Sequence, residues 1–303
     1  MATLKRSTER GLPKTRSENS DPLPRFEPAN SHCHVCGSDS GSTGLTQIAS
    51  PLVLRLSPRL ERLTLAVLDQ SDPVDLRIEG PGLRTFKLAE LDREAVGDRP
   101  AQLALTLHHC PALASLCLEF DSLASITLGD VDDGRAHHPH ASLRRLCIGD
   151  RSCSMPDEHL LAFLAQHGAG LSRLFIRRSV SEAAWPRLVT ALGQQLPQLT
   201  HLFLGSYPTH LSLSCPRLRM LSIWANGPCG SLQSLVLDCP RLEELMAPFN
   251  ETLETFELVG SASACAPPLW FIGKVGRAWE DRLEERFPQA SISNSCNRFS
   301  YGA

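Results

Sequence analysis

A short apolar pattern, Leu-x-x-Leu-x-(Ile/Leu), occurs three times in the middle of the chain. The copies begin at Leu143, Leu171 and Leu199, 28 residues apart. Each copy ends in an apolar-x-apolar triplet, which is typical of a short strand that buries one face. The residues between the copies predict helices. Strand, helix and strand at a fixed period indicate a protein built from stacked repeats.

Both segments between the copies contain helix signals. We expect Ser154 to be the N-cap of the first helix, with Pro156 in its first turn, and we expect the helix to end at Gly168. Trp185 and Pro186 are expected to begin the second helix. In both segments the apolar residues recur at helical spacing, which predicts one buried face.

Apolar pairs continue on both sides of this stretch, and many are only 9 to 11 residues apart. This spacing predicts coils of about 20 residues with an extended segment on each side. Counting outward from the central copies, we expect the strands of one sheet near Leu63, Phe86, Leu105, Ile126, Leu146, Leu174, Leu202, Leu221, Leu245 and Phe271. We expect the strands of the opposite side at Leu54, Leu76, Leu116, Leu211, Leu235 and Phe256.

The composition changes at both ends of the chain. Residues 1–46 are rich in Ser, Pro, Arg, Lys, Asn and Gly, which predicts a disordered polar tail. Residues 47–293 contain the repeats. Within them, residues 279–287 predict a helix and residues 290–292 a last strand, which together would close the core. Residues 294–303 are polar and predict a loose C-terminal tail.

This pattern resembles the leucine-rich repeat family, in the longer form of ribonuclease-inhibitor-like proteins and of F-box-associated repeats. The resemblance covers roughly residues 50–293 and implies an α/β solenoid. Its parallel sheet would line the concave side, with helices on the convex side mainly in the central coils. No F-box pattern is recognisable in residues 1–50.

One feature of the family pattern is mostly missing. Many leucine-rich repeats carry Asn or Cys after the strand, where the side chain bonds loop carbonyl groups. Arg151 and Tyr207 stand at that position here, and only Cys110 fits the pattern. The sequence therefore predicts that these carbonyl groups are bonded in another way.

The concave face is the expected binding surface. Residues that flank or separate the leucines of a strand point away from the core, and neighbouring strands lie about 4.8 Å apart. We expect a partner protein to contact Arg145, Arg173, Phe175, Arg177, His201, Phe203, Met220 and Trp224. Aromatic, Met and Arg residues are typical of binding hot spots. Alternatively, the aromatic side chains pack sideways on one another and only stiffen the sheet.

The charge and the cysteine content indicate which ligands and which cellular compartment the protein is suited to. The net charge of −3 does not favour binding to nucleic acid or to a membrane. The chain has no apolar run long enough for a transmembrane helix, and its N-terminus lacks the apolar region of a secretory signal. The odd count of 11 cysteines argues against a disulfide framework. We expect an intracellular protein, in the cytoplasm or nucleus, whose thiols stay free.

Three cysteines share a context. Cys110, Cys215 and Cys239 each precede a proline and lie three residues before a leucine. This placement predicts small buried residues at the corners of coils.

Three histidine-containing segments carry side chains that can bind a metal. Residues 32–36, His-Cys-His-Val-Cys, contain a Cys-x-x-Cys pair but lack two further ligands at a suitable spacing. Residues 137–140, His-His-Pro-His, lie in a polar stretch that predicts an exposed loop. His108 and His109 are expected to mark a strand end. The motifs of common nucleophiles and of phosphate-binding loops are missing, so we expect no metal, cofactor or catalytic site.

These observations favour a protein-protein interaction scaffold. An alternative is the substrate-recognition subunit of a cullin-type ubiquitin ligase without a visible F-box, which the family resemblance implies. A third hypothesis is an enzyme with a histidine-rich metal site.

Overall fold

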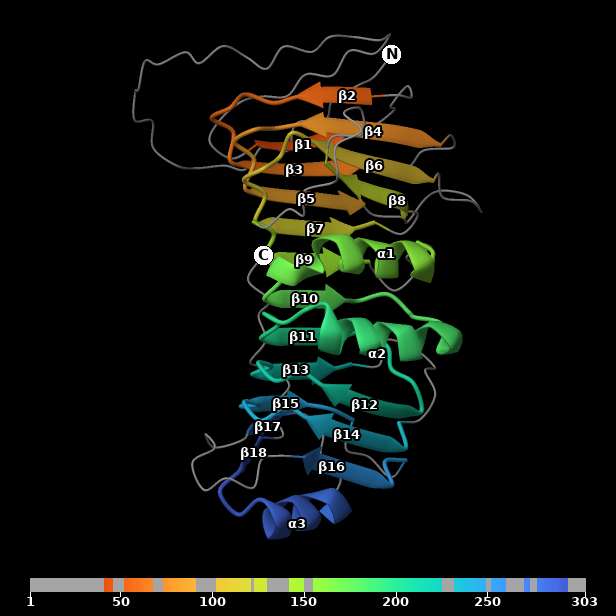
Figure 1. Ribbon diagram of the computed structural model, residues 1–303, viewed down its shortest axis with the longest axis vertical. Coiled ribbons are helices and arrows are strands. Elements are labelled where there is room, and N and C mark those ends of the chain that lie inside the picture. The colour runs from red at the N-terminus through yellow and green to blue at the C-terminus, as the bar shows by residue number, and fades with distance from the viewer. Residues whose placement is uncertain are drawn as a thin grey trace. The chain divides into compact units, whose positions relative to one another are not determined.

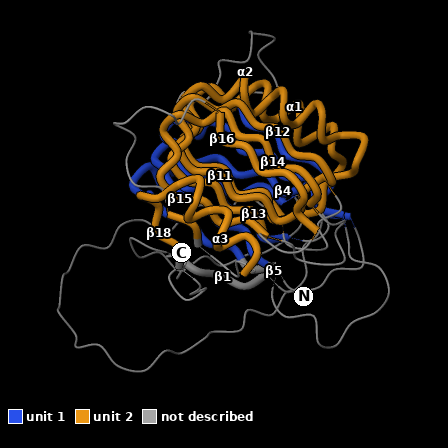
Figure 2. Tube along the Cα trace, turned by 90° about the horizontal axis from the view of Figure 1, so that it is seen from below, with its two compact units in different colours: residues 1–142 blue, residues 143–303 orange. Residues whose placement is uncertain are grey.

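The computed structural model describes residues 41–45, 52–67, 73–90, 102–120, 123–129, 142–149, 155–224, 232–248, 252–259, 270–272 and 277–293. They form an α/β structure of mostly parallel strands with few helices (Figure 1). The chain divides into two compact units, residues 1–142 and 143–303, which Figure 2 colours separately.

The first unit contains two parallel sheets between which successive strands alternate. One sheet has the order β1 (Gly41–Leu45), β3 (Arg62–Val67), β5 (Thr85–Glu90) and β7 (Ser115–Glu119). The other has the order β2 (Leu52–Arg55), β4 (Val74–Glu79), β6 (Leu103–His108) and β8 (Leu123–Leu128). Leu65 and Leu88 of the first sheet, and Leu76 and Ile78 of the second, are fully buried. The alternation of apolar and polar residues therefore produces the buried face of each sheet.

The second unit also has two layers. Its first sheet contains β9 (Arg145–Ile148), β10 (Arg173–Ile176), β11 (His201–Leu204), β13 (Met220–Ile223), β15 (Glu244–Met246), β17 (Trp270–Ile272) and β18 (Ser291–Ser293). The other layer contains α1 (Asp157–His167), α2 (Trp185–Gln194) and a sheet of β12 (His210–Ser214), β14 (Ser234–Asp238) and β16 (Thr255–Val259). Figure 1 shows these elements following one another down one side of the unit.

A row of leucines holds the second unit together. Leu146, Leu174, Leu202, Leu221 and Leu245 are aligned across five parallel strands. Each is at most 1% exposed. Phe271 continues the row in β17 and is fully buried. The repeated Leu-x-x-Leu-x-(Ile/Leu) pattern thus places the same apolar position at the same height in each strand.

The two central helices lie where the sequence predicts them, but one cap differs. α1 begins at Asp157, and Pro156, rather than Ser154, occupies the N-cap position without a side-chain hydrogen bond. Ser154 lies outside the described residues. Proline fits here because its fixed backbone angle suits a helix start and its missing amide is not needed there. α1 ends before Gly168, and α2 begins at Trp185 with Pro186 in its first turn, as predicted.

The assignment of strands to sheets was wrong in one part of the first unit. Leu116 lies in β7, which pairs with β5, whereas Leu105 and Ile126 lie in β6 and β8 of the other sheet. In this unit both strands of a coil carry nearly the same apolar pattern, and no helix distinguishes the two sides. A count carried outward from the helical repeats can therefore shift by one strand. The other expected strands lie in the predicted sheets.

Main-chain carbonyl groups ahead of the strands of the second unit form a ladder of hydrogen bonds. The carbonyl oxygen of Arg144 accepts the amides of Ser172 and Arg173, at 2.9 and 3.0 Å. The carbonyl groups of Ser172, Thr200 and Arg219 each accept two consecutive amides at the start of the next strand in the same way. Hydroxyl groups add to this ladder, because Thr200 Oγ1 donates to Ser172 O at 2.9 Å. After β10, where the family pattern would place an asparagine, the hydroxyl of Ser206 bonds the loop: it donates to Arg178 O at 3.3 Å and accepts the amide of Val180 at 3.1 Å.

The predicted helix and last strand at the end of the second unit are confirmed. α3 (Arg277–Arg286) buries Trp279 and Leu283, and β18 follows it. The indole Nε1 of Trp279 donates to Leu253 O at 3.0 Å. The ring of Phe256 lies edge-on to the indole, with centroids 6.4 Å apart, and packs with Phe271 and Phe287 at 5.8–6.0 Å. The terminal helix therefore covers the apolar core beyond β16.

The predicted tails lie mainly outside the described residues. Of residues 1–46, the structure describes 41–45, which form β1, and it describes none of 294–303. The predicted repeat region, residues 47–293, includes parts of both units.

An ion pair with little exposure joins α1 to the chain after β10. Nη2 of Arg178 contacts Oδ1 of Asp157, and the two side chains are 6% and 15% exposed. The other carboxylate oxygen of Asp157 accepts the amide of Ser181 at 3.1 Å and is also bonded by the Ser181 hydroxyl. Arg178 Nε donates to Ser179 O at 3.0 Å. Asp157 thus fixes the start of α1 to a segment about 20 residues later.

We predict that replacing Leu202 by alanine lowers the free energy of unfolding by roughly 2–5 kcal/mol, from lost burial and the cavity that remains. Leu202 is 1% exposed and belongs to the leucine row. Val259→Ala is the control, because this aliphatic side chain is 47% exposed and should change stability little. Chemical denaturation of both variants measures the difference. Equal stabilities would refute the leucine row as the core.

We further predict that Asp157→Ala costs roughly 3–5 kcal/mol of unfolding free energy, because it leaves Arg178 buried without its counter-ion. Glu158→Ala is a matched control. It removes the same charge from the same helix end, but its ion pair with Arg187 is exposed and contributes at most about 1 kcal/mol. Denaturation curves that coincide for the two variants would contradict this account.

Candidate protein-binding face

The side of the β9–β18 sheet opposite the leucine row is the candidate site, here called the sheet face. Strand register places its side chains in rows. The outer row contains Arg145, Arg173, His201, Met220, Glu244 and Trp270. The middle row contains Cys147, Phe175, Phe203, Ser222 and Met246. All eight predicted contact residues are in these rows or directly follow β10 or β13, as Arg177 and Trp224 do.

The middle row packs along the sheet. The rings of Phe175 and Phe203 are stacked, with centroids 6.2 Å apart and planes inclined by 29°. Ser222 Oγ lies 3.5 Å from Met246 Sδ. These contacts run from strand to strand, which is the sideways packing that the sequence left open as the alternative.

The sequence pattern predicts an exposed Phe203, and this expectation is wrong. Its side chain is only 7% exposed, while Phe175 is half-buried. Alternation determines the side of a sheet on which a residue lies, but the neighbouring side chains determine how much of it meets solvent. Phe203 therefore contributes more to the sheet than to any surface.

Two tryptophans are exposed on the sheet face. Trp224 directly follows β13, and its amide donates to Leu204 O at 2.8 Å, so the strand alternation continues through it. Trp270 lies in register with Glu244, in the outer row. Each side chain is 38% exposed. The sequence analysis identified Trp224 but missed Trp270. The signal was present, because a strand was predicted at Phe271, and in a strand the residue next to a buried one points to the opposite face.

Cationic side chains gather at the β9 end of the outer row. Arg145 lies over the ring of Phe175, with the guanidinium carbon 5.2 Å from the ring centroid. Arg173 is its exposed neighbour in register. His201 comes next, and its Nδ1 lies 2.9 Å from Thr200 Oγ1.

Burial and the neighbouring charges at the β9 end of the outer row change the pKa of His201. Burial lowers the pKa of His201 below the usual 6.5, and the positive charges of Arg173 and Arg219 lower it further. Glu243 opposes this shift, because its carboxylate favours the imidazolium. Arg219 is itself bonded to Glu243 through two nitrogens, at 2.8 Å each. His201 is therefore neutral at pH 7 and can accept as well as donate a hydrogen bond.

The remaining predicted residues have modest roles. Met220 is half-buried between His201 and Glu244 in the outer row. Arg177 is half-buried just beyond β10, and its amide donates to Ile148 O at 3.0 Å.

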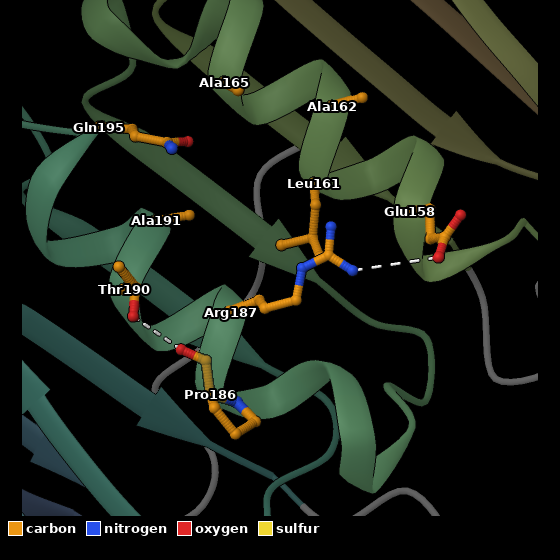
Figure 3. Close-up of a pocket in the computed structure, with 9 residues that line it drawn as sticks. All are labelled: Glu158, Leu161, Ala162, Ala165, Pro186, Arg187, Thr190, Ala191 and Gln195. Atoms are coloured by element: carbon orange, nitrogen blue, oxygen red, sulfur yellow. Dashed lines mark hydrogen bonds and ion pairs between the residues drawn. The ribbon is translucent and has the colours of Figure 1, made fainter.

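A groove of about 490 Å³ lies between α1 and α2 (Figure 3). Small apolar side chains line it, among them Ala162, Ala165 and Ala191. Its ion pair between Glu158 and Arg187, at 4.0 Å, is exposed. The hydroxyl of Thr190 donates to Pro186 O at 2.8 Å, within the helix. The groove thus presents helix surface and has no arrangement suited to nucleophilic or acid-base chemistry.

The three corner cysteines are free and buried, as predicted. Burial raises the pKa of Cys110 and of Cys239 to about 11, and that of Cys215 to about 12. At neutral pH these groups are thiols, which are poor nucleophiles and poor metal ligands. They serve as small apolar residues at the turns.

Residues 32–36 and 137–140 lie outside the described residues. His108 ends β6, which confirms the predicted strand end, and the next residue, His109, adopts a left-handed φ of 49°.

Comparisons with known proteins do not identify a family. No family model matches the chain, and no curated protein matches it. In the part of the chain that the structure describes, every helix is too short or too polar to cross a membrane.

The arrangement around His201 predicts a pKa below 6.5, measurable by NMR titration of the ring protons. Arg173→Gln removes one positive neighbour and should raise this pKa. Because the folded pKa is depressed, the neutral ring contributes stability that is fully present above the unfolded pKa of 6.5 and is lost as the pH falls from there through the lower folded pKa. His201→Gln should remove this part of the pH dependence. A pKa at or above 6.5 would refute the described environment.

Proposed function

We propose that this chain is a leucine-rich repeat protein that acts as a protein-protein interaction scaffold. In this proposal the sheet face is the concave face of a solenoid, and α1, α2 and the β12–β16 sheet form its convex side. The in-register leucine row and the return of the chain to the same sheet after each α-helix or opposite strand support it.

The exposed tryptophans support a binding role most directly. A large aromatic side chain on a surface contributes little to folding, whereas in an interface it buries a large apolar area. Trp224 and Trp270 are exposed on the same face, beside arginine and methionine residues. This combination is typical of interface hot spots.

The sheet beneath the tryptophans suits a rigid binding surface. In this sheet β10, β11, β13 and β15 are each hydrogen-bonded on both sides, and the ring stack of Phe175 and Phe203 braces the middle row. A partner would therefore meet a preorganised surface and would lose little free energy in ordering it.

The test is an affinity capture with the double variant Trp224→Ala/Trp270→Ala. Both indoles are exposed, so their removal should leave the fold intact, which circular dichroism checks. We expect specific partners of the native chain to be lost, with a fall in affinity of at least tenfold for a hot-spot pair. Phe203→Ala is unsuitable because that ring is buried and its removal would open a cavity.

The matched control is Val259→Ala, an exposed apolar truncation on β16. It should capture the same partners as the native chain. If the tryptophan variant also captures all of them, the sheet face is not the binding site.

A further inference from the structure

Two arginines lie side by side at the β9 end of the outer row. Arg145 and Arg173 are paired in register on adjacent parallel strands. Adjacent strands are about 4.8 Å apart, so the two side chains start from neighbouring positions on the same face. Like charges placed directly opposite each other destabilise a sheet. This pair therefore needs an explanation beyond the fold.

The described residues supply no counter-ion for this pair. Arg173 is exposed, and its side chain forms no ion pair or hydrogen bond within the part of the chain that the structure describes. Arg145 lies over Phe175, but its Nε is shielded from solvent and has no acceptor. The carboxylate in the same row, Glu244, is three strands from Arg173, about 14 Å at the usual strand spacing.

A nearby arginine shows the contrast. Arg219 belongs to the same sheet and is held by Glu243 through two hydrogen bonds of 2.8 Å. Arg219 has thus found a carboxylate in this sheet, whereas among the described residues neither Arg145 nor Arg173 has one.

The geometry holds these donors in place for a ligand. The ring of Phe175 supports the guanidinium of Arg145, which limits its motion. Nδ1 of His201, the next residue in the row, lies within hydrogen-bond distance of Thr200 Oγ1, so the ring is oriented beside Arg173. Two guanidinium forks therefore line one short stretch of the sheet face, with the oriented imidazole beside them.

We infer that the partner bound on the sheet face presents an acidic segment, whose Asp or Glu carboxylates bind between Arg145 and Arg173. Guanidinium groups bind carboxylates through paired, charge-assisted hydrogen bonds, which are the strong ones in proteins. The tryptophans would then bury an apolar part of the same partner. This inference rests on the proposed function, since it names the chemistry of the partner at the same face.

A polyanion such as nucleic acid fits the site less well. The cationic stretch is short, Glu243 and Glu244 follow two to three strands away, and the chain carries a net charge of −3. Nucleic-acid binding calls for an extended basic surface.

The test uses a fluorescein-labelled hexaglutamate peptide and fluorescence anisotropy with the full chain. We expect binding that weakens as salt screens the charges, and no binding of a hexaglutamine peptide. Arg145→Gln/Arg173→Gln should lower the affinity at least tenfold. Arg173→Gln alone should lower it in the same direction, and it cannot disturb the fold through a lost contact because this side chain is exposed and unbonded.

The matched control is Arg187→Gln/Arg241→Gln, which removes the same net charge from two other exposed positions of the second unit. It should bind hexaglutamate like the native chain. If both double variants lose affinity for hexaglutamate equally, the peptide responds only to the net charge of the protein, and the inference is overturned. Binding of a phosphoserine peptide without binding of hexaglutamate would overturn it as well, by pointing to another class of anion.

The two proposals fail separately. If the tryptophan variant loses its partners while hexaglutamate binds the native and Arg145→Gln/Arg173→Gln chains equally, the acidic segment is refuted and the scaffold stands. If the arginine variant alone loses the peptide and the tryptophan variant keeps every partner, the scaffold at this face is refuted.

Discussion

The shared carbonyl groups at the strand starts are the constraint on which the second unit depends. Each accepts two consecutive amides of the next strand, so a strand cannot slide by one residue without losing both bonds. This fixed register explains why Leu146, Leu174 and Leu202 meet at one height in the core. The same bonds also bring Arg145, Arg173 and His201 together on the opposite face. The same strand register therefore determines both the buried core and the arrangement of the candidate site.

The layer opposite the sheet face is less regular, and specific side chains hold it in place. Where a helix replaces a strand, the chain loses the ladder on that side. Asp157 and Arg178 compensate for this loss at α1, because they join the helix start to the segment after β10. At the end of the unit, the indole of Trp279 bonds Leu253 O and closes the apolar core.

The sequence predicts those features that repeat at a fixed spacing. The strands at Leu146, Leu174 and Leu202 and the helices between them follow from the local pattern. The position of Leu116 does not, because two equivalent strands per coil leave the count ambiguous. The burial of Phe203 depends on its neighbours in adjacent strands, and the pair of Asp157 and Arg178 joins residues whose types carry no local signal. The sequence also does not show that Arg145 and Arg173 lie side by side without a carboxylate partner among the described residues, because this depends on which residues the fold places around them.

The three corner cysteines, Cys110, Cys215 and Cys239, should react slowly with alkylating reagents as long as the protein is folded. Alkylating reagents react with the thiolate, and the raised pKa values of Cys110, Cys215 and Cys239 keep that form scarce at neutral pH. Modification at these three positions must then wait for a local opening that exposes the sulfur to water. The rate at which each thiol is alkylated therefore reports how often the turn that contains it opens to solvent.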